Sequence, residues 1–520
     1  MSRAFDSVVI GASADGLVAA SLLARAGRRV LVLEAAREPG GTLAEIEFAP
    51  KFHAAPLAPD LGHVHAEVLR ATGAVLPAAL APDPCAIALD ESGTLAIGRT
   101  PAATAESLAR FSAKDAAAWP AFAAGMHALT EFLGELLRRP AYAIEGAGAG
   151  GERLSLAGLA LRYRALGRRG MAELLRALPI SLADLLDDWF EGERLKGLLA
   201  AIGTADLPQG PMSGGTALAF LHRHVGAAPG TFGERLRLQT GGSALLRAFA
   251  DRARAAGARL ETGATVARIA VREDRVAGVV LATGEEIACG QVISAAGVGR
   301  TLLELVGPAH LETELIDALC HVRHRGVSSH VLLGLDGLPE IPGSAGPPVC
   351  GYWIAPSLRQ VERAWDDAKY GRRSAAPVIE LRFPSVTQPN LAPAGRHVAT
   401  LRVQYTPWRL ADGDWERERD LMADAAIAAV EARVPGFTSR IVQRVALAPP
   451  DLESRFGLAE GAVSRGEVAL DQLLFMRPVA GLGRHTTPLP GLFLCGAGTH
   501  PGPGLTGLSG LLAARAALPA

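Results

Sequence analysis

The sequence predicts an α/β protein in which a domain built on a parallel sheet is interrupted by an inserted α+β domain. Three features of the 520-residue chain support this prediction. An apolar strand enters a glycine-rich turn and an Ala/Leu-rich helix at residues 7–20. A second strand and glycine turn follow near the C-terminus, at 491–498, and a long helical region at 101–200 separates the two. We therefore expect both ends of the chain to belong to one domain.

The N-terminal unit has the pattern of a Rossmann βαβ unit that binds a dinucleotide. Gly11 permits the tight turn after the first strand, and Gly16 lets the helix pack close to that strand. Backbone N–H groups at the helix start then face a pyrophosphate, which the helix dipole also favours. A second strand at 30–33 ends on Glu34, about the distance at which an acidic side chain meets a ribose hydroxyl.

Two side chains in the glycine turn weaken this pattern. Ser13 stands where a glycine normally lets the phosphate approach the backbone, and extra atoms in a tight contact cost about 1–3 kcal/mol. Its hydroxyl can recover part of that loss by donating a hydrogen bond. Asp15 brings a carboxylate that stabilises the helix N-terminus but repels a pyrophosphate there. Gly40 and Gly41, after the second strand, still favour a nucleotide site.

The rest of the chain is predicted to alternate between the two domains. The helical region at 101–200 is interrupted by a flexible glycine-rich linker at 146–151. Further elements are expected as helices ending at 255, spanning 415–434 and spanning 510–517, and as strands at 258–266, 276–282, 285 onward, 291–297 and 397–405. The boundaries assign 1–75, 235–310 and 455–520 to the sheet-based domain, and 76–234 and 311–454 to the inserted domain.

Composition narrows the class of protein. The formal net charge is -1 and no basic patch occurs, so we expect no nucleic-acid partner. The five cysteines form no C-x-x-C pair, which excludes a redox-active dithiol and fits a reducing compartment. No apolar stretch is long enough for a transmembrane helix, and a strand near residue 6 leaves no room for a signal peptide. We expect a cytoplasmic protein.

The C-terminal strand and its glycines, Gly496, Gly498, Gly502 and Gly504, make a second half of one nucleotide site. With the N-terminal unit, they identify a resemblance to the phytoene desaturase-like FAD oxidoreductases, within the wider amine oxidase and carotenoid desaturase group. The branch called pyridine nucleotide-disulfide oxidoreductase domain-containing protein 2 is the most similar. Matching segments lie at 8–41, 214–250, 384–393, 404–408, 452–458, 466–478 and 492–514.

The resemblance implies a Rossmann-type FAD-binding domain of the GR2 type with an inserted α+β substrate domain, and FAD as the cofactor. Glu34 would then bind the ribose, the Val266 strand would lie beside the adenine, and the region 496–510 would lie along the flavin. Pro503 replaces a glycine and Leu512 replaces an asparagine, which leaves fewer polar donors. The expected cofactor-binding residues are Gly11, Ser13, Gly16, Glu34, Gly40, Gly41, Gly242, Val266, Gly297, Gly496, Gly498, Gly504 and Gly507.

Candidate catalytic residues come from the same C-terminal region. Flavin hydride chemistry often needs no acid or base beyond the cofactor. His500, next to the glycine turn, is one candidate, and its alternative is a capping histidine bonded to backbone. Arg477 is the other, and it either faces the flavin or forms a structural ion pair with Asp471.

Three further residues, Gln404, Tyr405 and Trp408, either line a substrate cavity or belong to the core. The run His222-Arg223-His224 and the pair His321 and His324 lack carboxylates or thiols at ligand spacing, so no metal site is expected.

The function indicated is an FAD-dependent oxidoreductase that transfers hydride to or from a carbon of an apolar or isoprenoid-like small molecule. The alternative is a flavin-free relative of this fold that acts as a binding or regulatory protein. NAD(P) in place of FAD is disfavoured, because Gly40-Gly41 and the C-terminal glycine segment resemble FAD sites. Glu34 would also repel the 2′-phosphate of NADP. Peripheral contact with a membrane and the oligomeric state stay open.

Overall fold

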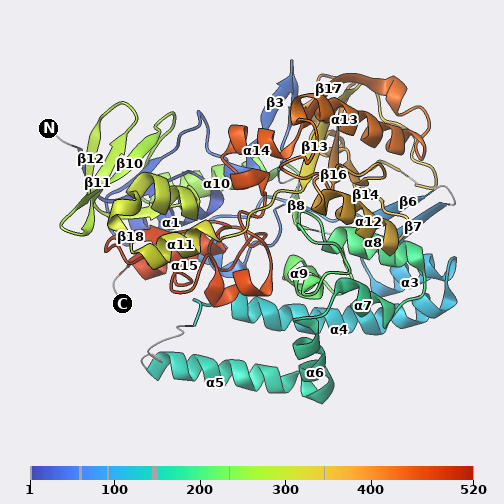
Figure 1. Ribbon diagram of the computed structural model, residues 1–520, viewed down its shortest axis with the longest axis horizontal. Helices are drawn as coiled ribbons and strands as arrows, with labels where there is room; N and C mark the ends of the chain where they lie inside the picture. The colour runs from blue at the N-terminus through green and yellow to red at the C-terminus, as the bar shows by residue number, and fades with distance from the viewer. Residues whose placement is uncertain are drawn as a thin grey trace.

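The computed structural model describes residues 3–57, 61–90, 93–142, 150–233, 235–344 and 346–518. Two seven-stranded sheets lie at opposite ends of its long axis, and a layer of helices runs beneath the second sheet (Figure 1). Segments from both ends of the chain meet in the first sheet. The expected α/β architecture with a Rossmann-type unit is confirmed.

The first sheet contains five parallel strands and an antiparallel extension. The parallel order is β9 (Arg259–Glu261), β2 (Val30–Leu33), β1 (Arg3–Ile10), β12 (Glu286–Ser294) and β18 (Leu492–Leu494). The first part of β12 also pairs antiparallel with β11 (Arg275–Leu281), which pairs with β10 (Val266–Arg272). Strand β2 is fully buried Val and Leu, as expected where helices or loops cover both faces of a parallel sheet.

Three helices with small residues pack closely beside this sheet: α1 (Ala14–Arg25), α10 (Gly242–Ala255) and α15 (Leu508–Ala517). A Cβ on Gly16 would lie 2.1 Å from the Gly11 carbonyl oxygen, so the predicted close approach of helix to strand requires glycine. A Cβ on Gly510 would lie 2.0 Å from the Asp15 carbonyl oxygen. The N-terminal ends of α1 and α15 therefore meet in backbone contact.

The second sheet combines strands from both predicted insertions. Its order is β17 (Ile441–Leu447), β13 (Ser328–Leu335), β16 (His397–Gln404), β15 (Val378–Arg382), β14 (Gly351–Ile354), β6 (Ala86–Asp90) and β7 (Gly93–Ile97). Helix α13 (Trp415–Glu431) packs its apolar side on one cluster of this sheet. Helices α8 (Glu193–Gly203) and α12 (Leu358–Lys369) pack together, with α8 against β6 and β14.

The region 101–200 is largely helical, as predicted. Its helices are α3 (Pro101–Ala109), α4 (Ala113–Leu137), α5 (Gly150–Ala165), α6 (Gly167–Ala177), α7 (Leu182–Asp187) and α8, with α9 (Thr216–Arg223) following. Trp119 and Phe122 of α4 are fully buried against Phe190 and Phe232. Most of the expected linker at 146–151 lies outside the described residues, and α5 begins at Gly150.

Two strand predictions are wrong and one hairpin lies in an unexpected place. The strands expected from 285 onward and at 291–297 are a single strand, β12, which ends at Ser294. The strand expected at 258–266 is two strands, because a turn with Gly263 at φ 69° separates β9 from β10. The hairpin of β3 (Ile46–Ala49) and β4 (Phe52–Ala54) belongs to the N-terminal stretch, yet Phe52 packs with Leu332 and Val398 of the second sheet. The domain boundaries as drawn from the sequence stay a prediction.

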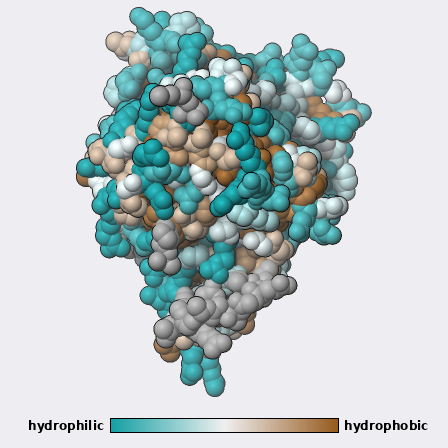
Figure 2. Space-filling view, turned by 90° about the vertical axis from the view of Figure 1, so that its left-hand side faces the viewer, coloured by the Kyte–Doolittle hydropathy of each residue, from teal (hydrophilic) through white to brown (hydrophobic). Residues whose placement is uncertain are grey.

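Short elements complete the chain. They are α2 (Ala66–Thr72), α11 (Thr313–Cys320), α14 (Pro449–Phe456), β5 (Ala79–Leu80) and β8 (Arg237–Leu238). Figure 2 views the end of the molecule that carries the first sheet; hydrophilic residues surround a central area of more apolar ones. Among the described residues, no helix combines the length and the apolar character needed to cross a bilayer.

Candidate active site

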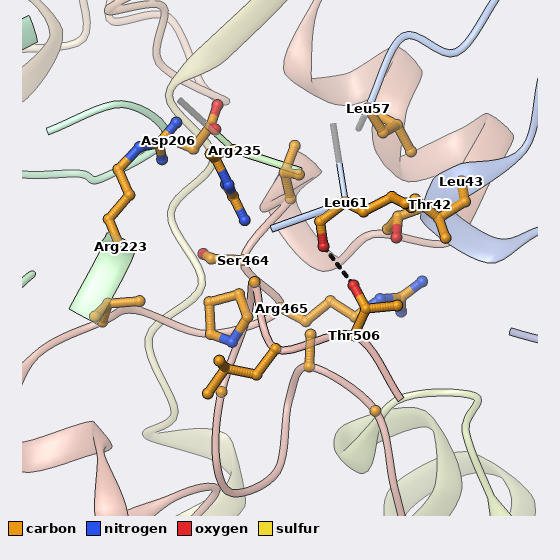
Figure 3. Close-up of a pocket in the computed structure, with 18 of the residues that line it drawn as sticks. Thr42, Leu43, Leu57, Leu61, Asp206, Arg223, Arg235, Ser464, Arg465 and Thr506 are labelled. Atoms are coloured by element: carbon orange, nitrogen blue, oxygen red, sulfur yellow. Dashed lines mark hydrogen bonds between the residues drawn. The ribbon is translucent and has the colours of Figure 1, made fainter. Parts of the chain in front are cut away.

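A cavity opens where three distant segments of the chain meet. The His63 N–H donates to the Gly504 carbonyl at 2.8 Å, and the Thr506 N–H donates to the His63 carbonyl at 2.9 Å. Leu61 pairs with Leu236 through its N–H at 2.8 Å. Figure 3 shows the Thr506 hydroxyl donating to the Leu61 carbonyl beside this cavity. These bonds join residues 61–63, 236 and 504–506 into one wall.

The cavity has a volume of about 190 Å³ and is lined from both halves of the molecule. The nucleotide half contributes the start of α1, the turn at 40–43, and the segments 463–465 and 502–506. The other half contributes Asp206, His222, Arg223 and Arg402. In Figure 3, Thr42 and Leu43 lie on one side, and Asp206, Arg223 and Arg235 gather on the other. The cavity therefore connects the expected dinucleotide site with the inserted domain.

The glycine turn of the N-terminal unit is held by its own polar groups. Gly11 has φ 95°, and the Ser13 hydroxyl caps α1 by accepting from the Gly16 N–H at 3.3 Å. The Glu34 carboxylate accepts from the N–H groups of Ala12 at 2.7 Å and Ala36 at 2.9 Å. A carboxylate has about four acceptor positions, so Glu34 keeps capacity for a ribose hydroxyl.

Asp15 faces the second helix rather than its own. Its carboxylate accepts from the Gly510 N–H at 3.1 Å, at the first turn of α15. Burial raises the pKa of this carboxyl to about 6, although the backbone N–H groups of α15 and the charge of Arg465 favour the ionised form. The repulsive charge expected here is therefore held close to two helix N-termini and one arginine.

The glycines predicted to bind the cofactor fall into two groups. Five predicted residues line the cavity: Ser13, Gly40, Gly41, Gly496 and Gly504. The others lie behind or beside the lining: Gly11, Gly16, Glu34, Gly242, Val266, Gly297, Gly498 and Gly507. Gly242 begins α10 and borders a second, smaller pocket, while Val266 is the buried first residue of β10, a strand that is otherwise mostly exposed or half-buried. The assignment of individual residues to parts of the cofactor stays a prediction.

Arg465 lines the cavity and carries an unsatisfied guanidinium. The residue is half-buried in a loop at φ 52°, and among the described residues its side chain has no hydrogen-bond acceptor or ion-pair partner. Burial and the charge of Arg300 lower the pKa of this guanidinium, and only the Asp15 carboxylate acts the other way. A cation that lines a cavity together with the N-terminus of α1 suits a pyrophosphate. The residues present therefore fit a dinucleotide such as FAD.

Arg477 is a structural residue, but the ion pair with Asp471 that the sequence predicted does not form. The guanidinium is buried and does not line the cavity. Asp471 pairs instead with Arg323 at 2.7 Å. The Arg477 nitrogens donate to the backbone carbonyls of Ser464, Gly466, Glu467, Gln472 and Ala497. Burial lowers the pKa of Arg477 to about 10. Arg477 thus fixes the loop that carries Arg465.

His500 also lies outside the cavity lining. Its Nε2 donates to the Arg139 carbonyl at the end of α4, at 2.7 Å, and the ring is almost completely buried. Burial lowers its pKa to about 4, so the imidazole is neutral at neutral pH. The alternative reading from the sequence, a histidine bonded to backbone, describes this geometry, and the structure gives His500 no route to a substrate in the cavity.

The inserted domain contributes residues that the sequence did not identify as functional. His222 of α9 lines the cavity, contacts the Pro501 carbonyl through Nε2 at 3.3 Å, and is neutral because burial lowers its pKa to about 4. Asp206 binds Arg402 at 2.5 Å, and this pair lowers the Asp206 pKa to about 2 despite burial. The only sequence signal was the His222-Arg223-His224 run, considered as a metal site.

His224 supports the aromatic core instead, with its ring against Phe220 and Phe232. The part of the chain that the structure describes brings no three His, Cys, Asp or Glu residues into a metal-binding group.

Of the three strand residues considered for the substrate cavity, none lines it. Gln404 accepts from the Asp206 N–H at 2.8 Å, and Tyr405 donates to the Thr204 hydroxyl at 2.8 Å. Trp408 donates to Glu453 at 2.8 Å. Gln404 and Tyr405 therefore hold the turn that presents Asp206, whose φ is 61°. They act on the cavity through their neighbours.

This geometry defines a Rossmann-type dinucleotide-binding protein whose second domain closes one side of the cofactor cavity. Comparison with known proteins agrees. Residues 9–66 match the NAD(P)-binding Rossmann-like domain, and residues 102–518 match the family described as flavin containing amine oxidoreductase. The protein called pyridine nucleotide-disulfide oxidoreductase domain-containing protein 2 from Rattus norvegicus is 33% identical over 98% of this chain and 93% of its own.

Two further similarities extend this result. A phytoene desaturase (neurosporene-forming) from Cereibacter sphaeroides is 27% identical over 52% of this chain and 51% of its own. The crystal structure of an oxidoreductase from Methanosarcina mazei has a TM-score of 0.58 at 15% identity, covering 97% of this chain and 99% of that one, which shows a shared fold.

The chain belongs to the flavin containing amine oxidoreductase family, in its carotenoid desaturase-like part. It is an FAD-dependent oxidoreductase, and the expected cofactor, FAD, is confirmed by the family.

Proposed function

We propose that this oxidoreductase transfers hydride between FAD and a carbon of an apolar, isoprenoid-like small molecule. The observation that carries the proposal is the apolar part of the cavity lining, Leu57, Leu61, Leu207, Val463, Val468 and Leu505. An apolar substrate gains free energy by leaving water for such a surface. The relative from Cereibacter sphaeroides, named a phytoene desaturase, supports the same class of substrate.

The charged part of the lining disfavours a cationic amine. Of the described residues that line the cavity, four are arginines, Arg223, Arg235, Arg402 and Arg465. The two acidic ones are already engaged: Asp206 pairs with Arg402, and Asp15 accepts from α15. A protonated amine would therefore enter a cationic site without an available carboxylate.

The chain's own residues bind and orient the reactants, and FAD supplies the hydride acceptor or donor. The wall formed by 61–63 and 504–506 fixes the side on which the two domains meet. His222 lines the cavity next to that wall as a neutral imidazole. Its Nε2 donates to the Pro501 carbonyl, and burial lowers its pKa to about 4, so it is a poor base at neutral pH. Asp206 is a poor base, because Arg402 stabilises its ionised form.

The test is anaerobic reduction of the protein-bound flavin, followed by loss of its visible absorption band. The panel contains an isoprenoid hydrocarbon, an isoprenoid alcohol, and a diamine of similar length. Bleaching by an isoprenoid but not by the diamine is the expected result. Bleaching by the diamine alone would overturn the proposed substrate class. Because the reaction can run in either direction, the reduced protein is also mixed with polyunsaturated isoprenoids, and the return of the band is recorded.

We also propose a cytoplasmic location. The five cysteines are free thiols, and four of them are buried, which suits a reducing compartment.

A further inference from the structure

We propose that Arg465 is the main counter-charge for the pyrophosphate of FAD, on the side of the cavity opposite the N–H groups of the N-terminal glycine turn. The inference concerns the cofactor alone and is independent of the substrate. The proposal rests on a comparison between the hydrogen-bond partners of the N-terminal turn and those of Arg465.

On the N-terminal side, the donors that usually face a phosphate are partly engaged. The Gly16 N–H is bonded to the Ser13 hydroxyl, and the Ala12 N–H is bonded to Glu34. Asp15 also lines the cavity, and its carboxylate is bonded to the start of α15. The N–H groups of Ser13 and Ala14, which line the cavity, have no acceptor among the described residues, so an anion at this end meets these donors together with one like charge.

On the other side, Arg465 lies beside two glycines. The position of a Cβ on Gly297 would be 3.7 Å from Arg465 Nη1, and a Cβ on Gly498 would be 3.2 Å from the Arg465 carbonyl oxygen. Both glycines belong to turns that follow strands of the nucleotide sheet, β12 and β18. A side chain on Gly498 would press on the backbone of Arg465, whereas a Cβ on Gly297 would only touch its guanidinium, so the turn at Gly498 is the one that makes room for the loop.

The loop around Arg465 is fixed before any ligand binds. Arg477 donates to the carbonyl of Ser464 at 2.9 Å and to that of Gly466 at 3.3 Å, the two neighbours of Arg465 in the chain. A fixed backbone lowers the entropy lost when the Arg465 side chain engages a ligand. Arg477 is therefore a positioning residue for the cofactor site.

The electrostatics of Arg465 favour an anion with two negative charges. Its guanidinium lies near the positive charge of Arg300, with Asp15 as the opposing carboxylate charge. Arg465 has five N–H donors in a planar fork that suits phosphate oxygens bidentately. A pyrophosphate would satisfy these donors and relieve the repulsion between the two arginines.

The experiment compares apo-protein carrying Arg465→Gln or Arg465→Lys with a control variant, Arg300→Gln, which removes the neighbouring exposed cation. Binding of FAD, ADP and riboflavin is measured by fluorescence titration at two salt concentrations. A thermal melt of each apo-protein shows whether it is folded. ADP contains the pyrophosphate without the flavin, and riboflavin contains the flavin without the pyrophosphate.

We expect Arg465→Gln to weaken FAD and ADP binding by about 10- to 100-fold, the range for a charge-assisted hydrogen bond, and to leave riboflavin binding unchanged. Arg465→Lys should recover part of this loss, and Arg300→Gln should change FAD binding less than about 3-fold. FAD binding to the Gln variant should also depend less on salt.

Equal losses for ADP and riboflavin, or an unchanged ADP affinity in a folded Arg465→Gln protein, would overturn the proposal. If the Gln variant does not fold, Arg465→Lys decides: an ADP-specific weakening supports the pyrophosphate contact, and a loss shared with riboflavin refutes it.

Discussion

The N-terminal turn and the C-terminal loops both line the dinucleotide cavity, but they offer a ligand different polar groups. The N-terminal turn has the recognisable glycine pattern, but Ser13 and Glu34 accept hydrogen bonds from its N–H groups. The loops at 464–466 and 496–504 have little regular structure, yet they present Arg465 to the cavity and are tied together by Arg477. The glycine motif thus indicates where the ligand binds, while a loop without a motif supplies the positive charge opposite the ligand's phosphates.

The largest effect on stability is expected from replacing Arg477, whose guanidinium joins the loops on the C-terminal side of the cavity. Arg477→Met would leave five buried carbonyls without their donor and lower the free energy of unfolding by about 4 kcal/mol. Chemical denaturation measures this loss, with Arg455→Met on the exposed side of α14 as the control. An Arg477→Met protein as stable as the natural chain would contradict this structural role of Arg477.

Gly510→Ala tests the close backbone contact between the N-terminal ends of α1 and α15. Its Cβ would lie 2.0 Å from the Asp15 carbonyl oxygen, so α1 and α15 must separate. We expect a loss of about 3 kcal/mol in the free energy of unfolding and weaker FAD binding. The matched control is Gly125→Ala in α4, where a Cβ meets no atom within 4 Å and where alanine favours the helix. Equal melting temperatures for the two variants would contradict the close contact.

Asp15→Asn removes the negative charge at the N-terminal end of α1 and keeps a side chain of nearly the same size and shape. Because the folded pKa is raised from 3.8 to about 6, the native state holds the proton more tightly than the unfolded chain. The stability that this provides is complete below pH 3.8 and is lost as the pH rises through about 6. The Asn variant should be more stable than the natural chain by about 1–3 kcal/mol at pH 8 and equally stable at pH 3.5.

Thermal melts of the apo-proteins across this pH range measure the difference. Parallel curves for the two proteins would show that the Asp15 carboxyl does not titrate in this window. FAD binding at pH 8 should also be tighter in the Asn variant, because the like charge near the pyrophosphate is gone.

The smallest effect is expected from Ser13→Gly, which frees the Gly16 N–H. FAD affinity should rise by about 3- to 5-fold, less than 1 kcal/mol, since Arg465 already carries much of the charge. Ser112→Gly removes the equivalent cap from α4, where the hydroxyl accepts from the Asp115 N–H at 3.1 Å. Both variants should lose only a few tenths of a kcal/mol of stability. An increase in FAD affinity of 100-fold would place the main phosphate contact back on the N-terminal turn.

Elements with strong local patterns could be predicted from the sequence. The apolar runs of β1, β2 and β18 and the glycines that follow them specify strand and turn without long-range information. The strand expected at 258–266 failed because periodicity continues through Gly263, whereas β9 and β10 join different partners in the sheet. Which strand pairs with which is a tertiary property.

The cavity could be predicted only on the nucleotide side. Arg465, Asp206 and Arg402 come from a loop, a turn and a strand that are separated widely in the chain, and none stands in a local motif. The sequence therefore offered His500 and Arg477, which neighbour the glycine turns along the chain but point into backbone. Proximity in sequence to a motif indicates a region, and the direction of a side chain depends on packing.

The late position of β18 and α15 in the chain has a consequence for biosynthesis. Residues 492–517 supply one strand of the parallel sheet and the helix end that accepts Asp15. They are synthesised after every other strand of this sheet, so β12 has an open edge until β18 has emerged from the ribosome. A chain in synthesis therefore presents only part of the cavity lining until Gly496 and the segment 502–506 have emerged.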